Sequence, residues 1–247
     1  MNATAVLLVL ADGRFPAGAH AHSTGVEAAC GVGDIHDLDS LAAYVRGRIA
    51  NTGAVEAAFT AAACHRAAVA SQRAGAAACH RVRASADTAT PAPWAEFDAE
   101  FAARTASPVV RAASRSLGRQ LLRAADRVWP SPLYAGLRVA GPGGAPFQPV
   151  ALGVVAAVAG LAPPDAALAA LHGFVTGMTT AAVRLLGLDP FSVAAVVARL
   201  TPTVTALVDE AAAHAGDPIP DLPATVGLLA DVLAEHHATW EVRLFAS

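Results

Sequence analysis

The 247-residue chain is predicted to be all-α, a single-domain bundle of roughly nine or ten helices. Alanine, a strong helix former, dominates a composition that is 55% hydrophobic and only 5% aromatic, so the helices are expected to pack through small side chains. Sustained period-2 alternation bounded by hairpin turns, the pattern of β-strands, is absent. A loop near residue 140 could divide the chain, but a helical bundle needs both halves to close its core. We therefore expect one helical domain over residues 1–247.

Helix-start signals define the first half of the chain. Asp39 or Ser40 can cap a long helix that is interrupted at residues 51–53, where the sequence is Asn-Thr-Gly. Ser107 followed by Pro108 is an N-cap with proline at the first helical position. After an opening apolar run over residues 5–11, the expected helices cover residues 41–70, 72–84, 94–103 and 108–128.

A stretch rich in Gly and Pro, residues 139–149, opens the second half. Gly and Pro are the strongest local interrupters of regular structure, so this stretch is predicted to be an exposed loop. The helices expected after it cover residues 150–161, 165–188, 190–213 and 223–240.

Charge and composition exclude several kinds of chemistry. The net charge of −3 gives no overall attraction to nucleic acid. All 17 basic residues are arginine, so a Walker-type phosphate loop and Schiff-base catalysis, which both need a lysine, are excluded. The chain has no G-x-S-x-G motif and no evident pair of carboxylates at a cleft. We therefore expect no cofactor and no catalytic residues.

The cysteines and the apolar runs bear on the compartment. Three cysteines form no even disulfide framework, and the first residues lack the basic region of a secretory signal, so a reducing cytoplasm is expected. The run over residues 166–183 is diluted by His, Gly and Thr, and a bilayer span needs about 20 predominantly apolar residues. No membrane association is expected.

Two Cys-His pairs suggest a metal, namely Cys64-His65 and Cys79-His80. On one continuous helix, pairs fifteen residues apart lie about 22 Å from each other and cannot share an ion. We favour small buried cysteines beside surface histidines, and we predict no metal site.

Five arginines at strict i,i+4 spacing form a ridge on the helix predicted over residues 108–128. Like charges at this spacing repel, so the ridge should have anionic partners. Carboxylates of the preceding segment (Glu96, Asp98 and Glu100) are the favoured explanation, and an acidic protein partner is the alternative. The ridge consists of Arg111, Arg115, Arg119, Arg123 and Arg127.

The most distinctive segment is the opening loop, residues 12–27. Its three Gly and one Pro give it a defined shape, and it leads into a helix for which Ser23 is a plausible N-cap, with Glu27 in the next turn. As a candidate partner surface, it should place four residues at or near the surface: Pro16, Gly18, His20 and His22.

The opening loop resembles that of the UreF family of urease accessory proteins, which reads approximately L-P-x-G-x-x-x-H-S-x-G-L-E. A departure occurs where the family commonly has P-L-G-Q and this chain has Gly-Leu-Asp-Pro at residues 187–190. The similar segments run in the family's order to the chain end: Phe15 to Gly18, His22-Ser23, Gly25 to Glu27, Leu117-Gly118, Ala182 to Leu185, His237, and Arg243 to Ser247.

The resemblance implies a homodimeric, non-enzymatic, all-helical chaperone component for nickel insertion into urease. Family members bridge the GTPase UreG and the scaffold UreD (also called UreH), and the complex activates apo-urease. The resemblance also implies that the apolar C-terminus becomes ordered on the UreD scaffold. The implied partner-binding residues are Pro16, Gly18, His20, His22, Glu27, Arg111, Arg115, Arg119, Arg184, Arg243, Leu244 and Phe245.

Two alternatives remain open at this point. One is a helical enzyme with His22 and Glu27 in a cleft, and the other is a nickel-binding storage protein. Turnover by the isolated protein would favour the enzyme, and stoichiometric nickel binding would favour the store.

Overall fold

The computed structural model describes residues 2–18, 22–79 and 94–245, with the backbone alone for residues 74–79. Within these ranges the chain forms α-helices and no β-strand, which confirms the all-α class. The helices are α1 (Ala3–Ala11), α2 (Val26–Gly31), α3 (Leu38–Arg48), α4 (Ala54–Cys79), α5 (Trp94–Ala103), α6 (Pro108–Val128), α7 (Leu133–Ala140), α8 (Gln148–Val158), α9 (Pro163–Leu186), α10 (Pro190–Ala213) and α11 (Leu228–Ala238).

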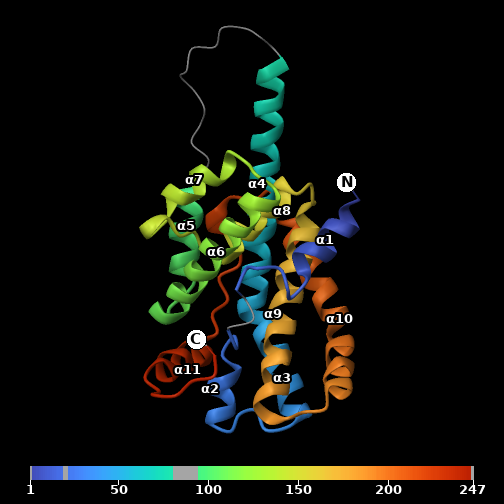
Figure 1. Cartoon of the computed structure of the whole chain (residues 1–247), viewed down its shortest axis with the longest axis vertical. Coiled ribbons are helices and arrows are strands. Elements are labelled where there is room, and N and C mark those ends of the chain that lie inside the picture. Colours follow the sequence, from blue (N-terminus) through green and yellow to red (C-terminus); the bar gives the residue numbers. More distant parts are fainter. Residues whose placement is uncertain (1, 19–21, 80–93, 246–247) are drawn as a thin grey trace.

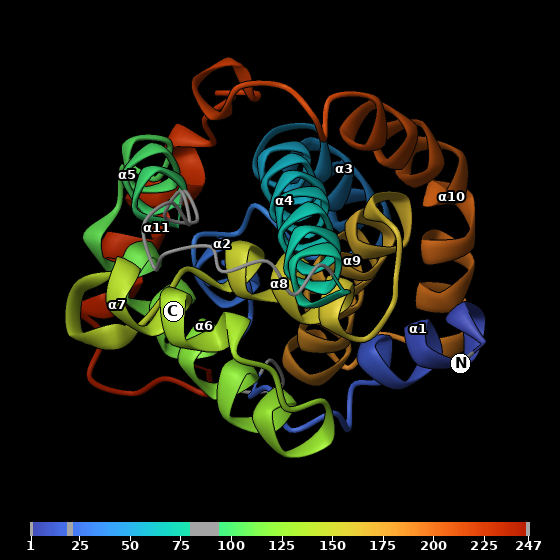
Figure 2. The ribbon, with the colours of Figure 1, turned by 90° about the horizontal axis from the view of Figure 1, so that it is seen from above.

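Helix α4 runs along the long axis of the molecule and packs against α8 and α9 (Figure 1). Seen from above, α4, α8 and α9 form the middle of the molecule, with α1 and α10 on one side and α5, α7 and α11 on the other (Figure 2). Because α4 precedes the loop near residue 140 and α8 and α9 follow it, helices from both halves of the chain share one core.

Close helix packing depends on small residues, as the composition predicts. At the contact of α8 with α4, a Cβ added to Gly153 would lie 2.3 Å from the carbonyl oxygen of Thr60. Aromatic rings fill the space where α4, α5 and the start of α8 meet: Phe101 lies 5.1 Å from Phe59 and 4.9 Å from Phe147, measured between ring centroids.

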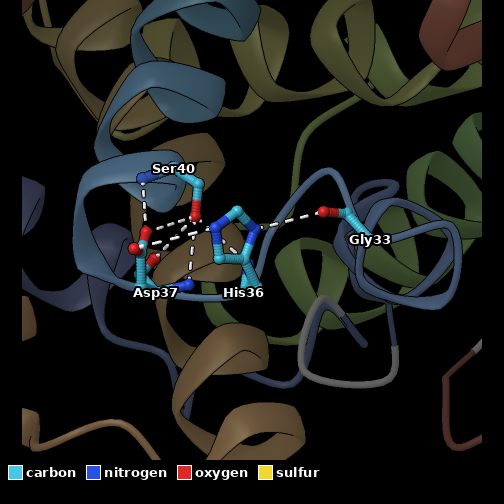
Figure 3. Close-up of polar contacts among 4 residues, drawn as sticks. All are labelled: Gly33, His36, Asp37 and Ser40. Atoms are coloured by element: carbon cyan, nitrogen blue, oxygen red, sulfur yellow. Dashed lines mark hydrogen bonds and ion pairs between the residues drawn. The ribbon is translucent and has the colours of Figure 1, made fainter.

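The start of α3 is fixed by a capping box (Figure 3). Asp37 Oδ1 accepts a hydrogen bond from the Ser40 backbone at 2.8 Å, and Ser40 Oγ accepts one from the Asp37 backbone at 3.0 Å. His36 Nδ1 lies 3.1 Å from the Gly33 carbonyl oxygen. Hydrogen bonds from the Ser40 side chain and backbone lower the pKa of Asp37. The N-cap is therefore Asp37, and the prediction of Asp39 or Ser40 was wrong because the helix begins one turn earlier.

The expected interruption at residues 51–53 is a π-helical turn, Ile49–Gly53, that joins α3 to α4 without a break in direction. The Asn51 side chain donates to the carbonyl oxygen of Gly47 at 3.0 Å, and Thr225 donates to that of Asn51 at 3.1 Å. Beyond the turn, α4 continues to Cys79, whereas the sequence predicted a break after residue 70. The break was wrong because that stretch contains no proline and is rich in alanine.

The prediction of an exposed loop over residues 139–149 was wrong in part. Helices α7 and α8 take up its two ends, and residues 145–147 between them are buried. Gly118 explains the burial, because a Cβ there would lie 2.1 Å from the Pro146 carbonyl oxygen, so only glycine lets this segment lie against α6.

Three other helices have the bounds that the sequence predicted. Helices α5, α6 and α10 have the predicted bounds, and Ser107 accepts a hydrogen bond from the Val110 backbone at 3.1 Å as the N-cap of α6. Helix α11 begins later than predicted, at Leu228, after an irregular stretch with a 3₁₀ turn at Ile219–Asp221.

Helices α9 and α10 are each long and apolar enough, by length and composition alone, to cross a bilayer. The core helix of a soluble protein meets the same criterion. In the most apolar stretch of α9, 61% is buried against the rest of the molecule, as in a core helix, and in α10 the share is 22%.

Candidate partner-binding site

The opening loop leads into the short helix α2. Gly25 is its N-cap, in the left-handed conformation with φ +87°, which glycine adopts without strain. The prediction that Ser23 is the N-cap was wrong, because the helix begins at Val26. The buried Ser23 hydroxyl still accepts a long hydrogen bond of 3.4 Å from the Glu27 backbone. This turn places the Glu27 side chain in the interior, where it is 7% exposed.

The Glu27 carboxylate holds the C-terminal segment (residues 239–245). Oε1 accepts a hydrogen bond from the Leu244 backbone at 2.7 Å, and Oε2 accepts one from the Phe245 backbone at 2.9 Å. Oε2 also lies 3.0 Å from Nε2 of the buried His237, at the end of α11. Glu27 is therefore an anchor at which α2, α11 and the C-terminal segment meet.

Side chains of the C-terminal segment add two contacts to this anchor. The Trp240 ring lies against Gly31, where a Cβ would come within 2.2 Å of the ring. Phe245 is buried, and the guanidinium of Arg184 lies 4.8 Å from the centre of its ring. The family resemblance implied that the C-terminus becomes ordered on the scaffold, but Phe245 is already buried within this chain, whereas Arg243 and Leu244 are exposed.

Helix α11 is also fixed from its other side. The Glu235 carboxylate accepts hydrogen bonds from the Ser107 hydroxyl and from the Val109 backbone at the start of α6. These bonds, first the one from Ser107, lower the pKa of Glu235. A helix held in this way presents a defined outer side, and large apolar side chains are exposed on it and on the segment that follows. The C-terminal apolar face consists of Leu228, Leu229, Val232, Val242 and Leu244, each between 63% and 83% exposed.

The opening loop is at or near the surface where it is described. Pro16 is exposed and Gly18 and His22 are half-buried, while His20 lies outside the described residues. Gly18 has φ +81°, and a Cβ there would lie 2.1 Å from the Gln120 side chain of α6. The loop is therefore shaped by its glycine and placed beside α6.

The arginine ridge on α6 divides into internal and exposed members. Arg115 pairs with Asp98 of α5 at 2.7 and 2.8 Å, as the favoured explanation predicts, and stacks 3.8 Å from the centre of the Phe147 ring. Arg111 donates to the carbonyl oxygens of residues 105 and 106. The other three arginines are exposed and form no hydrogen bond or ion pair within the described part of the chain: Arg119, Arg123 and Arg127.

A cavity of about 180 Å³, which no sequence pattern predicted, lies between α6, α9, α11 and the π-helical turn. His22 and His237 line it, but Glu27 does not, because its carboxylate is occupied by the C-terminal segment. The hypothesis of a catalytic cleft shared by His22 and Glu27 is therefore not supported. In the described residues, no group of three or more His, Cys, Asp or Glu side chains is placed to hold a metal ion.

Arg48 and Glu56 also line the cavity. Glu56 is half-buried and faces the cavity, and the partial loss of its contact with water raises the pKa of its carboxyl to about 7, although the charge of Arg48 lowers it. One sequence signal could have indicated this site. The Asn-Thr-Gly interruption contains Thr52, and an arginine lies four residues before it and a glutamate four residues after it.

The raised pKa of Glu56 predicts a pH-dependent stability. The carboxyl ordinarily loses its proton near pH 4.5, so between pH 4.5 and 7 the folded state binds more protons than the unfolded state. The free energy of unfolding should therefore fall as the pH rises through this window, by about 3 kcal/mol at most. Glu56→Gln should remove this loss and stabilise the protein at pH 8 but not at pH 4.5, as measured by urea unfolding. An equal effect at both pH values would contradict the assignment, and Glu241→Gln at an exposed acid is the control.

By its fold and its surface, the molecule is an all-helical protein with exposed apolar side chains beside an anchored C-terminal segment. The family model for UreF matches residues 35–201. Over the full length of both chains, the sequence is 43% identical to the urease accessory protein UreF of Mycolicibacterium vanbaalenii, 42% to that of a Mycobacterium species (strain JLS) and 37% to that of Mycobacterium tuberculosis. The chain belongs to the UreF family of urease accessory proteins.

Proposed function

We propose that this protein is a non-catalytic component of urease maturation in the cytoplasm. In this proposal it bridges a UreD/UreH-like scaffold and a UreG-like GTPase while nickel is inserted into apo-urease, and it acts as a homodimer. Full-length similarity to urease accessory proteins supports the general role. The particular partners rest on the family resemblance together with the surfaces described above.

The C-terminal apolar face is the observation that carries the proposal. Large apolar side chains that are exposed on one helix and on the segment after it indicate a site of interaction, because leaving them in water costs free energy. The anchors at Glu27 and Glu235 hold this face in place before any partner binds, so little ordering entropy is lost on association. We assign this face to the scaffold, with Arg184, Arg243 and Phe245 at its edge.

The opening loop and α6 supply a second, polar surface. In the loop, Pro16 is exposed and Gly18 lies against α6. On α6, Arg119 is an exposed cation without an internal partner in the described residues, one turn before the exposed Arg123. Arg111 and Arg115 lie on the same helix but have internal contacts, so they support this surface from beneath. We assign it to the GTPase.

Leu229→Glu tests the assignment of the apolar face. Leu229 is 64% exposed, so the change should alter the stability of the isolated protein by less than about 0.5 kcal/mol. Binding to the purified scaffold, measured by calorimetry, should weaken at least tenfold because a charge would be buried without a partner. Val139→Glu, at an 83% exposed apolar residue of α7, is the matched control and should bind normally. Unchanged affinity of Leu229→Glu would overturn the assignment.

A further inference from the structure

The cavity has the size and lining of a site for a small organic molecule. Its volume of about 180 Å³ compares with engineered cavities of about 150 Å³ that bind benzene. Most of its wall is apolar, with Val110 and Leu117 from α6 and Phe174 from α9. Such a wall suits the hydrocarbon part of a ligand.

One wall of the cavity is polar and is built by the π-helical turn. Arg48, Thr52 and Glu56 follow each other at steps of four residues, and all three line the cavity. In a regular α-helix, with 3.6 residues per turn, side chains four residues apart gradually move around the helix axis. The wider π turn between Arg48 and Glu56 has more residues per turn and reduces this rotation. The irregularity therefore brings an arginine and a carboxyl to the same wall. Such π turns occur frequently at functional sites.

Among the described residues, Arg48 has no acceptor for its hydrogen-bond donors. Its buried Nε has no partner, and in the described part of the chain the guanidinium forms no hydrogen bond or ion pair. The guanidinium does lie over the ring of Phe174, whose centre is 5.5 Å from Cζ, but an aromatic ring is not a hydrogen-bond acceptor for all five donors. Because a guanidinium has five donors and stays charged, an oxyanion in the cavity would satisfy groups that the protein leaves unsatisfied.

Glu56 complements Arg48 without neutralising it. The two side chains form no ion pair with each other, and in the described residues the Glu56 carboxyl has no hydrogen bond. With a pKa of about 7, the carboxyl carries a proton in a large fraction of molecules near neutral pH. A protonated carboxyl donates a hydrogen bond to an oxyanion instead of repelling it.

We propose that this cavity binds a small organic carboxylate, with the carboxylate group on Arg48 and the hydrocarbon part against Phe174 and α6. This site goes beyond the proposed bridging function, which needs no small ligand. An organic cation is the alternative occupant, and the permanent charge of Arg48 disfavours it. The site lies next to His237, so a bound carboxylate would lie beside the anchor of the C-terminal segment.

Benzoate and benzylamine test the proposal on the unmodified full-length protein, because they share a ring and differ in the sign of their charge. Titration calorimetry at pH 7.5 should show saturable benzoate binding that is at least tenfold tighter than benzylamine binding. Tighter binding of benzylamine, or no binding of benzoate, would overturn the proposal without any variant.

Arg48→Met removes the guanidinium and its charge but keeps an unbranched side chain in contact with the cavity. It should weaken benzoate binding about 10- to 100-fold, the range expected for loss of a hydrogen bond to a charged group. Arg46→Met is the matched control, since Arg46 is exposed on the same helix and does not line the cavity, and it should bind benzoate normally. Glu56→Gln should bind benzoate at least as tightly as the unmodified protein. Equal loss in Arg48→Met and Arg46→Met would refute the role of Arg48, and these results do not depend on scaffold or GTPase binding.

Discussion

Replacing Arg115 by methionine is expected to lower the free energy of unfolding by about 3–5 kcal/mol, the usual cost of removing one partner of a buried ion pair. Arg115 and Asp98 have side chains only 15% and 14% exposed, and the change would leave the Asp98 carboxylate buried without its cation. It would also remove the hydrogen bond of Arg115 to the Ala145 carbonyl oxygen and its contact with the Phe147 ring. The midpoint of thermal unfolding should fall by roughly 6–20 °C.

Arg119→Met is the matched control for this prediction. It removes the same side chain one turn further along α6, where the guanidinium is exposed and has no internal partner in the described residues. Its expected effect on stability is within about 0.5 kcal/mol. Urea unfolding of both variants would decide, and similar losses for the two would show that the ridge acts as a whole instead of through the pair with Asp98.

Glu27→Ala is expected to release the C-terminal segment. The change removes the acceptor of two backbone hydrogen bonds and the partner of His237, and buried groups left unsatisfied cost about 1–3 kcal/mol each. Trypsin cleavage after Arg243 provides a direct measurement, because the hydrogen bond from the Leu244 backbone to Glu27 holds that peptide bond. Mass spectrometry should show faster loss of residues 244–247 from Glu27→Ala, together with a lower midpoint of thermal unfolding.

Glu241→Ala is the control for the release of the segment. Glu241 is an exposed acid within the same segment, and none of the described hydrogen bonds or ion pairs involves it. Its cleavage rate after Arg243 should equal that of the unmodified protein. If Glu27→Ala is also cleaved at the unmodified rate, the carboxylate does not hold the segment and the anchor assignment fails.

Where an N-cap residue and a proline lie next to each other in the sequence, they indicate where a helix begins. Ser107-Pro108 combines an N-cap with proline at the first helical position, and α6 begins there as predicted. In the structure, Asp189 and Pro190 give α10 the same kind of start. The burial of residues 145–147 was not predictable in this way. It depends on Gly118, about thirty residues earlier in the chain, which allows the segment to lie against α6.

The candidate site shows the same division between local and long-range information. The motifs that resemble the family include Glu27 near one end of the chain and Phe245 near the other, but no local pattern predicts a contact across 218 residues. For Arg115, the acidic segment before α6 did predict the carboxylate partner, because the two helices are neighbours in sequence. The cavity was missed since its lining comes from residues 22 to 237.

The bridging function is tested most directly by immobilising a UreD/UreH-like scaffold and adding a UreG-like GTPase with and without this protein. The account predicts that the GTPase is retained only when this protein is present, and that Leu229→Glu, which should not bind the scaffold, fails to retain it. Val139→Glu should retain the GTPase as well as the unmodified protein does. Equal retention of the GTPase in the absence of this protein, or failure of this protein to retain it while bound to the scaffold, would contradict the bridging role.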